Sequence, residues 1–222
     1  MDNLRKQRLT RRELQLLLLV TPAPLAAALL AGKMSGIAVA QDSDATPGSD
    51  TTPVLAPTPE CGDTEDFEVT QAQTAGPFFT PDSQERTSML EDGMPGAELL
   101  LTGYVYAPNC EPIPGALIDF WQCDDAGVYD NVGYTLRGHQ FSADDGRYEL
   151  TTIVPGLYPG RTRHIHVNVQ APNGPILTSQ LYFPDEPANA ADGIFDERLI
   201  MDVSEDDDRQ IGFFTFVVEG NS

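Results

Sequence analysis

Short apolar runs separated by turn residues dominate the second half of the chain. Six runs rich in β-branched and aromatic residues are shorter than ordinary helices and follow the alternation typical of strands. Pro, Gly, Asn and Asp separate them, as in Asp144-Asp-Gly and Ala171-Pro-Asn-Gly, and predict turns. The predicted strands are Leu99 to Tyr106, Ala116 to Gln122, Arg147 to Ile153, His164 to Gln170, Ile176 to Phe183 and Phe213 to Val218.

Strands of this length and spacing predict an all-β fold, a two-sheet β-sandwich in which inward and outward residues alternate. No long helical period follows the N-terminal region. The stretch from Pro187 to Asp208 is acidic and weakly patterned, and we expect a loop with one helical turn there. Trp121 stands in the middle of a predicted strand, which favours a place in the core over a place in a pocket.

The first forty residues have the pattern of a targeting segment. A basic stretch from Arg5 to Arg12 precedes an apolar run from Leu16 to Leu30, and Ala38-Val-Ala40 resembles a cleavage site. This predicts a signal peptide over residues 1–40 and export of the mature protein. The pair Arg11-Arg12 resembles a twin-arginine signal, and an ordinary secretory signal remains the alternative.

Residues 41–59 consist mostly of Asp, Ser, Thr, Pro and Ala, so they cannot bury enough apolar surface to order themselves. They are predicted to be a disordered linker, and residues 60–222 are predicted to form the folded domain. Cys61 and Cys110 lie in polar, loop-like surroundings and could pair in an oxidising exterior. Cys123 lies in an apolar run and is expected to be a buried free thiol.

The chain is strongly acidic. Its formal charge is −21, and after removal of residues 1–40 seven arginines face 32 acidic residues. Such a surface repels phosphate backbones and anionic lipids, so we expect no nucleic-acid partner and no stable membrane association after signal cleavage. The sequence leaves a homo-oligomer open.

The chain has three histidines, and two of them form His164-Ile-His166 in a predicted strand. Residues two apart on a strand point to the same face and lie about 6.5–7 Å apart along it. Both imidazoles can therefore reach one metal ion, although an isolated pair of this kind is more often two unrelated side chains. His139 precedes Phe141 in a Gly-containing loop and is left out of the site.

The segment before this strand carries two Pro-Gly pairs, in Val154-Pro-Gly-Leu-Tyr158-Pro-Gly-Arg161. They predict tight turns that hold a tyrosine and an arginine beside the start of the strand. A tyrosine between two turns is often only a hydrophobic plug. Its neighbours make a ligand role for Tyr158 competitive with that interpretation.

Taken together, these residues resemble the intradiol ring-cleavage dioxygenases, the family of catechol 1,2-dioxygenase and protocatechuate 3,4-dioxygenase. The resemblance covers about Thr74 to Phe183, and no single motif would carry it. The matching pieces are Thr74-Ala-Gly-Pro-Phe-Phe79, Gly103-Tyr-Val-Tyr106, Ile113-Pro-Gly-Ala-Leu-Ile-Asp-Phe-Trp-Gln122, Gly127-Val-Tyr129, Asp145-Gly-Arg-Tyr-Glu149, Ile153-Val-Pro-Gly-Leu-Tyr158, Arg161-Thr-Arg-His-Ile-His166 and Leu177-Thr-Ser-Gln-Leu181.

The resemblance implies one Fe(3+) ion held by Tyr129, Tyr158, His164 and His166, with Tyr134 as the fallback for Tyr129. It implies that catecholic substrates and O2 react there, with cleavage between the two hydroxylated carbons to give cis,cis-muconate-type diacids. Phenolate oxygens are hard anionic donors, which suits the ferric ion.

In this resemblance Tyr158 matches the axial tyrosinate that substrate displaces. Arg161 would stabilise negative charge on the substrate and Gln180 would orient substrate by hydrogen bonding. Arg163 departs from the family pattern, because better-known members carry a small residue there.

Two other classes of protein compete with this interpretation. A non-catalytic, secreted β-sandwich module would account for the turn motifs but has no need of Tyr129, His164 and His166 together. A cupin-type iron(II) enzyme would carry a glutamate soon after the His-x-His pair. Here His166 is followed by Val-Asn-Val-Gln-Ala-Pro-Asn-Gly, without a carboxylate.

Overall fold

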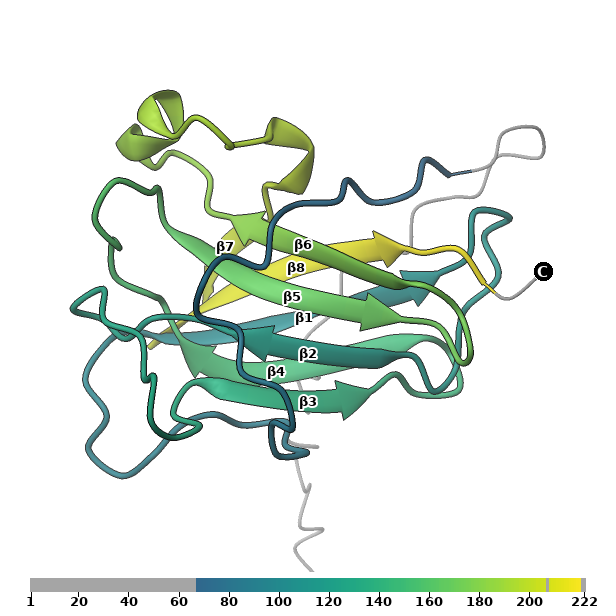
Figure 1. Ribbon diagram of the computed structural model, residues 1–222, viewed down its shortest axis with the longest axis horizontal. Coiled ribbons are helices and arrows are strands. Elements are labelled where there is room, and N and C mark those ends of the chain that lie inside the picture. Colours follow the sequence, from purple (N-terminus) through teal and green to yellow (C-terminus); the bar gives the residue numbers. More distant parts are fainter. Residues whose placement is uncertain (1–66, 207, 221–222) are drawn as a thin grey trace, which may run out of the picture. The chain divides into compact units, whose positions relative to one another are not determined.

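The computed structural model describes residues 67–206 and 208–220, which form two packed four-stranded sheets (Figure 1). The predicted signal peptide, the linker and Cys61 lie outside these residues. One sheet has the order β4-β1-β8-β7 and the other β3-β2-β5-β6. The strands are β1 (Glu98–Tyr106), β2 (Leu117–Trp121), β3 (Arg137–Phe141), β4 (Arg147–Ile153), β5 (His164–Gln170), β6 (Ile176–Tyr182), β7 (Asp202–Asp206) and β8 (Arg209–Val217).

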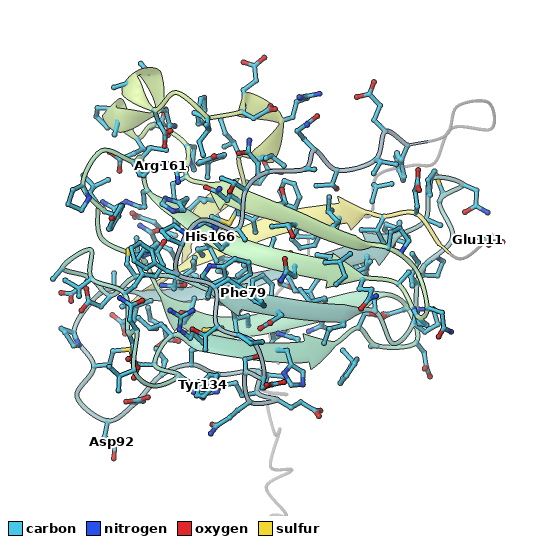
Figure 2. All side chains as sticks on the ribbon, viewed as in Figure 1. Phe79, Asp92, Glu111, Tyr134, Arg161 and His166 are labelled. Carbon is cyan, nitrogen blue, oxygen red and sulfur yellow. The ribbon has the colours of Figure 1, made fainter. Side chains whose placement is uncertain are left out.

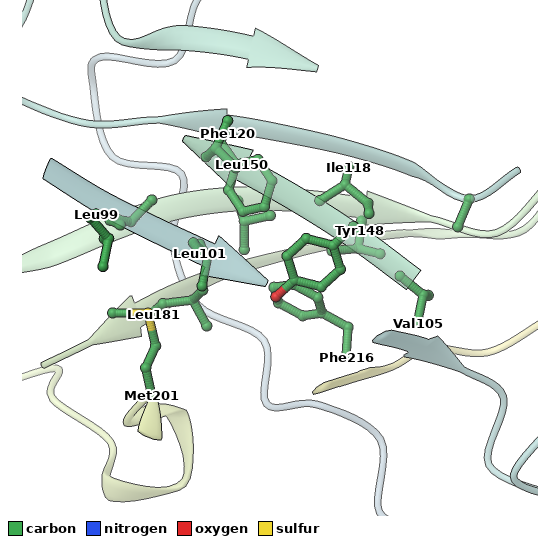
Figure 3. Packing of buried hydrophobic residues seen from close by; sticks show 14 of the residues in the cluster. Leu99, Leu101, Val105, Ile118, Phe120, Tyr148, Leu150, Leu181, Met201 and Phe216 are labelled. Carbon is green, nitrogen blue, oxygen red and sulfur yellow. The ribbon is translucent and has the colours of Figure 1, made fainter. Parts of the chain in front are cut away.

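The core between the sheets follows the predicted alternation. In β5 the residues Ile165, Val167 and Val169 are fully buried in it, while the residues between them face the other side of the sheet. Leu99 and Leu101 of β1 meet them from the opposite sheet (Figure 3). Burial of these side chains is the main force holding the sheets together.

The sequence analysis did not predict two of the strands. The segment Arg137–Phe141 forms β3, an edge strand that pairs antiparallel with β2, although it lacks β-branched residues. The acidic segment Asp202–Asp206 forms β7, a mostly exposed edge strand that pairs with β8. Pairing with a neighbour decided both, because isolated propensity in these sequences is weak. The rest of the expected loop contains two 3-10 helices, Pro187–Ala191 and Glu197–Leu199.

Residues 73–86 cross the outer face of the β3-β2-β5-β6 sheet as an extended segment (Figure 1). Gln73 donates its backbone N–H to Thr178 of β6 at one edge, and Arg86 donates to His139 of β3 at the other. Between these anchors the segment passes over β5 and β2. It therefore covers the sheet face that does not belong to the main core.

Within residues 67–206 and 208–220, no helix is long and apolar enough to cross a membrane. Cys123 is buried and free, as predicted. Pairing of Cys110 with Cys61 stays a prediction, because Cys61 lies outside the described residues.

Candidate metal centre

The candidate site lies on the outer face of the β3-β2-β5-β6 sheet, under the crossing segment. Strand register places Trp121 of β2, His166 of β5 and Gln180 of β6 in one row. His164 stands two residues earlier on the same face, opposite Tyr182. The alternation of β5 thus puts both histidines outside the main core, as the His-x-His spacing predicts.

The two imidazoles converge. His164 Nε2 lies 3.2 Å from His166 Nε2. Two nitrogens bound to one metal at about 2.1 Å and roughly a right angle would lie about 3 Å apart. The Nδ1–H of His164 donates to the Thr162 carbonyl at 2.6 Å, so its Nε2 carries a lone pair.

Burial keeps both rings neutral. Desolvation lowers the pKa of His164 to about 4, and Arg161 adds to this while the Thr162 carbonyl opposes it. Desolvation, then the neighbouring His164, lowers the pKa of His166 further below its usual range. Neutral imidazoles with free Nε2 lone pairs are what a metal ion binds.

Tyr129 completes a trio of donor atoms. It lies in the loop after β2, is only 6% exposed, and its hydroxyl is 3.2 Å from His164 Nε2. Its ring stacks on Phe78 of the crossing segment at 4.6 Å. Burial raises its pKa, and the nearby Cys123 thiol adds to the rise, so without a metal Tyr129 is a neutral phenol.

Tyr158 packs against this group from a second loop. Its ring meets Tyr129 edge-on at 5.8 Å and Phe78 at 5.4 Å, and it is only partly buried. Tyr134, in contrast, donates its hydroxyl to the Pro81 carbonyl and lies well away from His166 (Figure 2). Of the two candidates in the first loop, Tyr129 is therefore the one beside the histidines.

Two glycines allow the tyrosine-bearing loops to touch. Gly156 donates its N–H to the Asp124 carbonyl at 2.7 Å. A Cβ on Gly156 would lie 2.4 Å from the Asp125 carbonyl oxygen, and one on Gly127 would lie 2.3 Å from that of Leu157. Gly127 also has φ +80°, which side chains disfavour. The Gly127-Val-Tyr129 and Pro155-Gly-Leu-Tyr158 motifs thus have a steric reason.

Arg161 and Gln180 meet at the edge of the site. Arg161 Nη2 donates to Gln180 Oε1 at 2.6 Å, and Gln180 Nε2 donates to the Thr74 carbonyl at 2.8 Å. Arg161 Nε donates to Asp192 at 2.8 Å. Arg163, the departure from the family pattern, pairs with Glu186 and also donates to the Pro155 carbonyl.

The donor set fits a metal. Among the described residues no group of three or more His, Cys, Asp or Glu side chains could hold an ion, so the convergent set is two imidazoles with phenols. One lone pair on His164 Nε2 faces both the Tyr129 hydroxyl and His166 Nε2. His166 Nδ1 is buried without a hydrogen-bond partner, although the Thr74 backbone lies close enough to raise the pKa of this ring. A cation among these atoms would satisfy the facing Nε2 lone pairs and accept a phenolate.

The sequence profile of a family described as Dioxygenase matches residues 74–218, more than half of the chain. The chain also carries two facing imidazoles beside two packed tyrosines, so its family can be assigned. It belongs to the intradiol ring-cleavage dioxygenase family.

Several relatives of this chain carry the name of a dioxygenase. A hydroxyquinol 1,2-dioxygenase from Rhizobium sp. (strain MTP-10005) is 28% identical over 169 residues, 63% of this chain and 57% of the relative. The dioxygenase domain of a dioxygenase carbohydrate-binding protein fusion from Streptomyces sp. SirexAA-E is 51% identical, with a TM-score of 0.68 over 69% of this chain and 100% of that one. Chlorocatechol 1,2-dioxygenase from Rhodococcus opacus 1CP shares the fold at 24% identity, with a TM-score of 0.63 over 68% of this chain and 73% of that one. The chain spans between about half and three fifths of the curated relatives it matches.

Sequence reasoning missed two residues of this site. Trp121 is buried, as predicted, but outside the main core: its ring stacks on His166 at 4.9 Å and 3°. The alternation of β2 could have shown this, since Phe120 faces inward. Asp192 comes from the acidic loop expected to be unpatterned, and no local signal marks it.

Proposed function

We propose that this domain is an iron(III)-dependent intradiol dioxygenase that cleaves catecholic rings between the two hydroxylated carbons with O2, giving cis,cis-muconate-type diacids. One observation carries the proposal: the Tyr129 hydroxyl and His166 Nε2 each lie 3.2 Å from His164 Nε2. Tyr158, packed beside Tyr129, would be the fourth ligand.

Iron(III) in this site would act as a Lewis acid that makes a chelated catecholate reactive toward O2. Tyr129 is suited to remain bound, because its ring is fixed by Phe78 and almost fully buried. Tyr158 is only partly buried, so as a phenolate it could accept one catechol proton and then move away as a neutral phenol. Arg161 and Gln180, locked together, would hold the substrate oxygen by hydrogen bonding.

The test of metal binding compares a histidine of the site with the histidine that lies outside it. His166→Ala removes one facing imidazole and is expected to abolish binding of one equivalent of ferric iron per chain. His139→Ala is the matched control, because His139 lies on the edge strand β3, where it contacts Ser83 of the crossing segment, and its loss should leave iron binding intact. Equal iron content in both variants would refute the assignment of the ligands.

The test of the reaction measures oxygen consumption and identifies the product. Catechol added aerobically to the iron-loaded protein should consume one O2 per ring and yield a ring-opened diacid. A yellow semialdehyde would mean cleavage outside the diol. The loaded protein should also be red-brown from phenolate-to-iron charge transfer, and a colourless protein with stoichiometric iron would exclude tyrosinate ligands. The non-catalytic module would bind no iron at all.

We also propose that the domain is exported and works outside the cell or in the cell envelope, after removal of residues 1–40. The sequence pattern of the N-terminus supports this. Mass determination of the protein recovered from the culture medium would test it, with a mature N-terminus at Gln41 expected.

A further inference from the structure

Asp192 is a buried carboxylate that binds the arginine of the site. Its side chain is 2% exposed and accepts from Arg161 Nε at 2.8 Å and from the Thr162 backbone N–H at 2.9 Å. It reaches the site from the turn after the 3-10 helix Pro187–Ala191, about 30 residues further along the chain. Asn189 of that helix accepts a second bond, from the Thr162 hydroxyl at 2.6 Å. The turn is thus tied to the start of β5.

This contact holds a negative charge directly against the positive charge of Arg161. Burial acts to raise the pKa of Asp192, but hydrogen bonds from the backbone N–H groups of Thr162 and Ile194 and from Arg161 outweigh it, so the pKa is lowered. Asp192 is therefore ionised at neutral pH. Arg161 therefore faces the site as a directed hydrogen-bond donor whose positive charge is partly offset by the adjacent carboxylate.

Most other arginines among the described residues cannot take the place of Arg161 as a cation at the site. Arg163 pairs with Glu186, and three more arginines pair with carboxylates at the surface. Arg137 is buried and donates to the Asp130 carbonyl, and it has no ion-pair partner among the described residues. Arg86 donates to Gln84 and packs over Gly138 of the edge strand β3. The chain as a whole carries a formal charge of −21, so an additional anion approaches a strongly acidic protein.

We propose that Asp192 sets the charge selectivity of the site by offsetting the charge of Arg161. The enzyme then selects catechols without a charged ring substituent and disfavours catechols that carry a ring carboxylate. This selectivity rests on the proposed dioxygenase function. Asp192 acts through Arg161 and does not itself touch the substrate, so it is a positioning residue.

The first test needs no mutation. 3,4-Dihydroxybenzamide and 3,4-dihydroxybenzoate have nearly the same shape and differ by one negative charge. The iron-loaded protein should use the amide with a kcat/KM at least about tenfold higher than the acid, the scale of one uncompensated charge at substrate distance in a protein. Equal kcat/KM values for the two compounds would overturn the proposal.

The second test removes the charge of Asp192. Asp192→Asn keeps one oxygen that can accept from Arg161 and Thr162 and loses the bond donated by the Ile194 N–H, so the contact with Arg161 is kept while its charge is released. The amide-to-acid ratio should fall at least about tenfold, mainly through the KM of the acid. Asp196→Asn, which alters an exposed pair with Arg198 in the same segment, should leave the ratio unchanged. A merely structural role for Asp192 would lower both kcat/KM values together and leave their ratio constant.

Binding separates this proposal from the proposed function. Equilibrium dialysis of the iron-loaded protein without oxygen measures the binding of the amide and of the acid without turnover. If no compound consumes oxygen, the dioxygenase proposal fails. A tighter binding of the amide than of the acid that disappears in Asp192→Asn would still support charge selectivity, and equal binding would refute it.

Discussion

Gly127→Ala is predicted to separate the two loops that carry the tyrosines. Gly127 has φ +80°, and a Cβ there would lie 2.3 Å from the Leu157 carbonyl oxygen, one residue before Tyr158. The positive φ alone costs a side chain about 1–2 kcal/mol. Relief of the contact requires a backbone shift of roughly 1 Å, and we expect an added cost of about 1–3 kcal/mol, as for overpacking elsewhere.

Gly160→Ala is the matched control. Gly160 has φ +81°, and a Cβ there would meet nothing within 4 Å, so it carries the cost of the φ angle without the collision. Denaturant unfolding of the metal-free proteins should show Gly127→Ala to be the less stable by about 1–3 kcal/mol. Gly127→Ala should also retain less iron after gel filtration, because Tyr129 stands two residues further on. Equal stability of the two variants would refute a backbone contact between the loops.

Three further predictions concern the site. Tyr129→Phe should weaken iron retention by at least about 100-fold, whereas Tyr158→Phe should retain iron and lose activity; identical behaviour would refute the division of roles. Asp192 has a lowered folded-state pKa, so its stabilisation is present above the unfolded pKa of about 3.9 and is lost as pH falls through the folded pKa. Acid unfolding below pH 4 should therefore be shallower in Asp192→Asn, and an unchanged pH slope would contradict the burial of an ionised pair. Ferric iron should quench Trp121 fluorescence in the wild type but not in His166→Ala; quenching in both would place the ion elsewhere.

The sequence determined which face most side chains take. Strand alternation places Ile165 in the core and His164 and His166 on the opposite face, because successive side chains on a strand point to opposite sides whatever the rest of the fold does. The Pro-Gly motifs likewise indicated that Tyr158 stands in a turn next to β5. These are local properties of the backbone and can be read from neighbouring residues.

Tertiary structure alone decided which distant residues meet. The pairing of β2 with β5 placed Trp121 against His166, and the packing of the loop after β6 brought Asp192 to Arg161. Edge strands β3 and β7 also formed through their neighbours. The first two contacts join residues more than 30 apart in the chain, and their register depends on how both sheets close around the core. No period in the sequence carries that information, since it arises from burial summed over the whole domain.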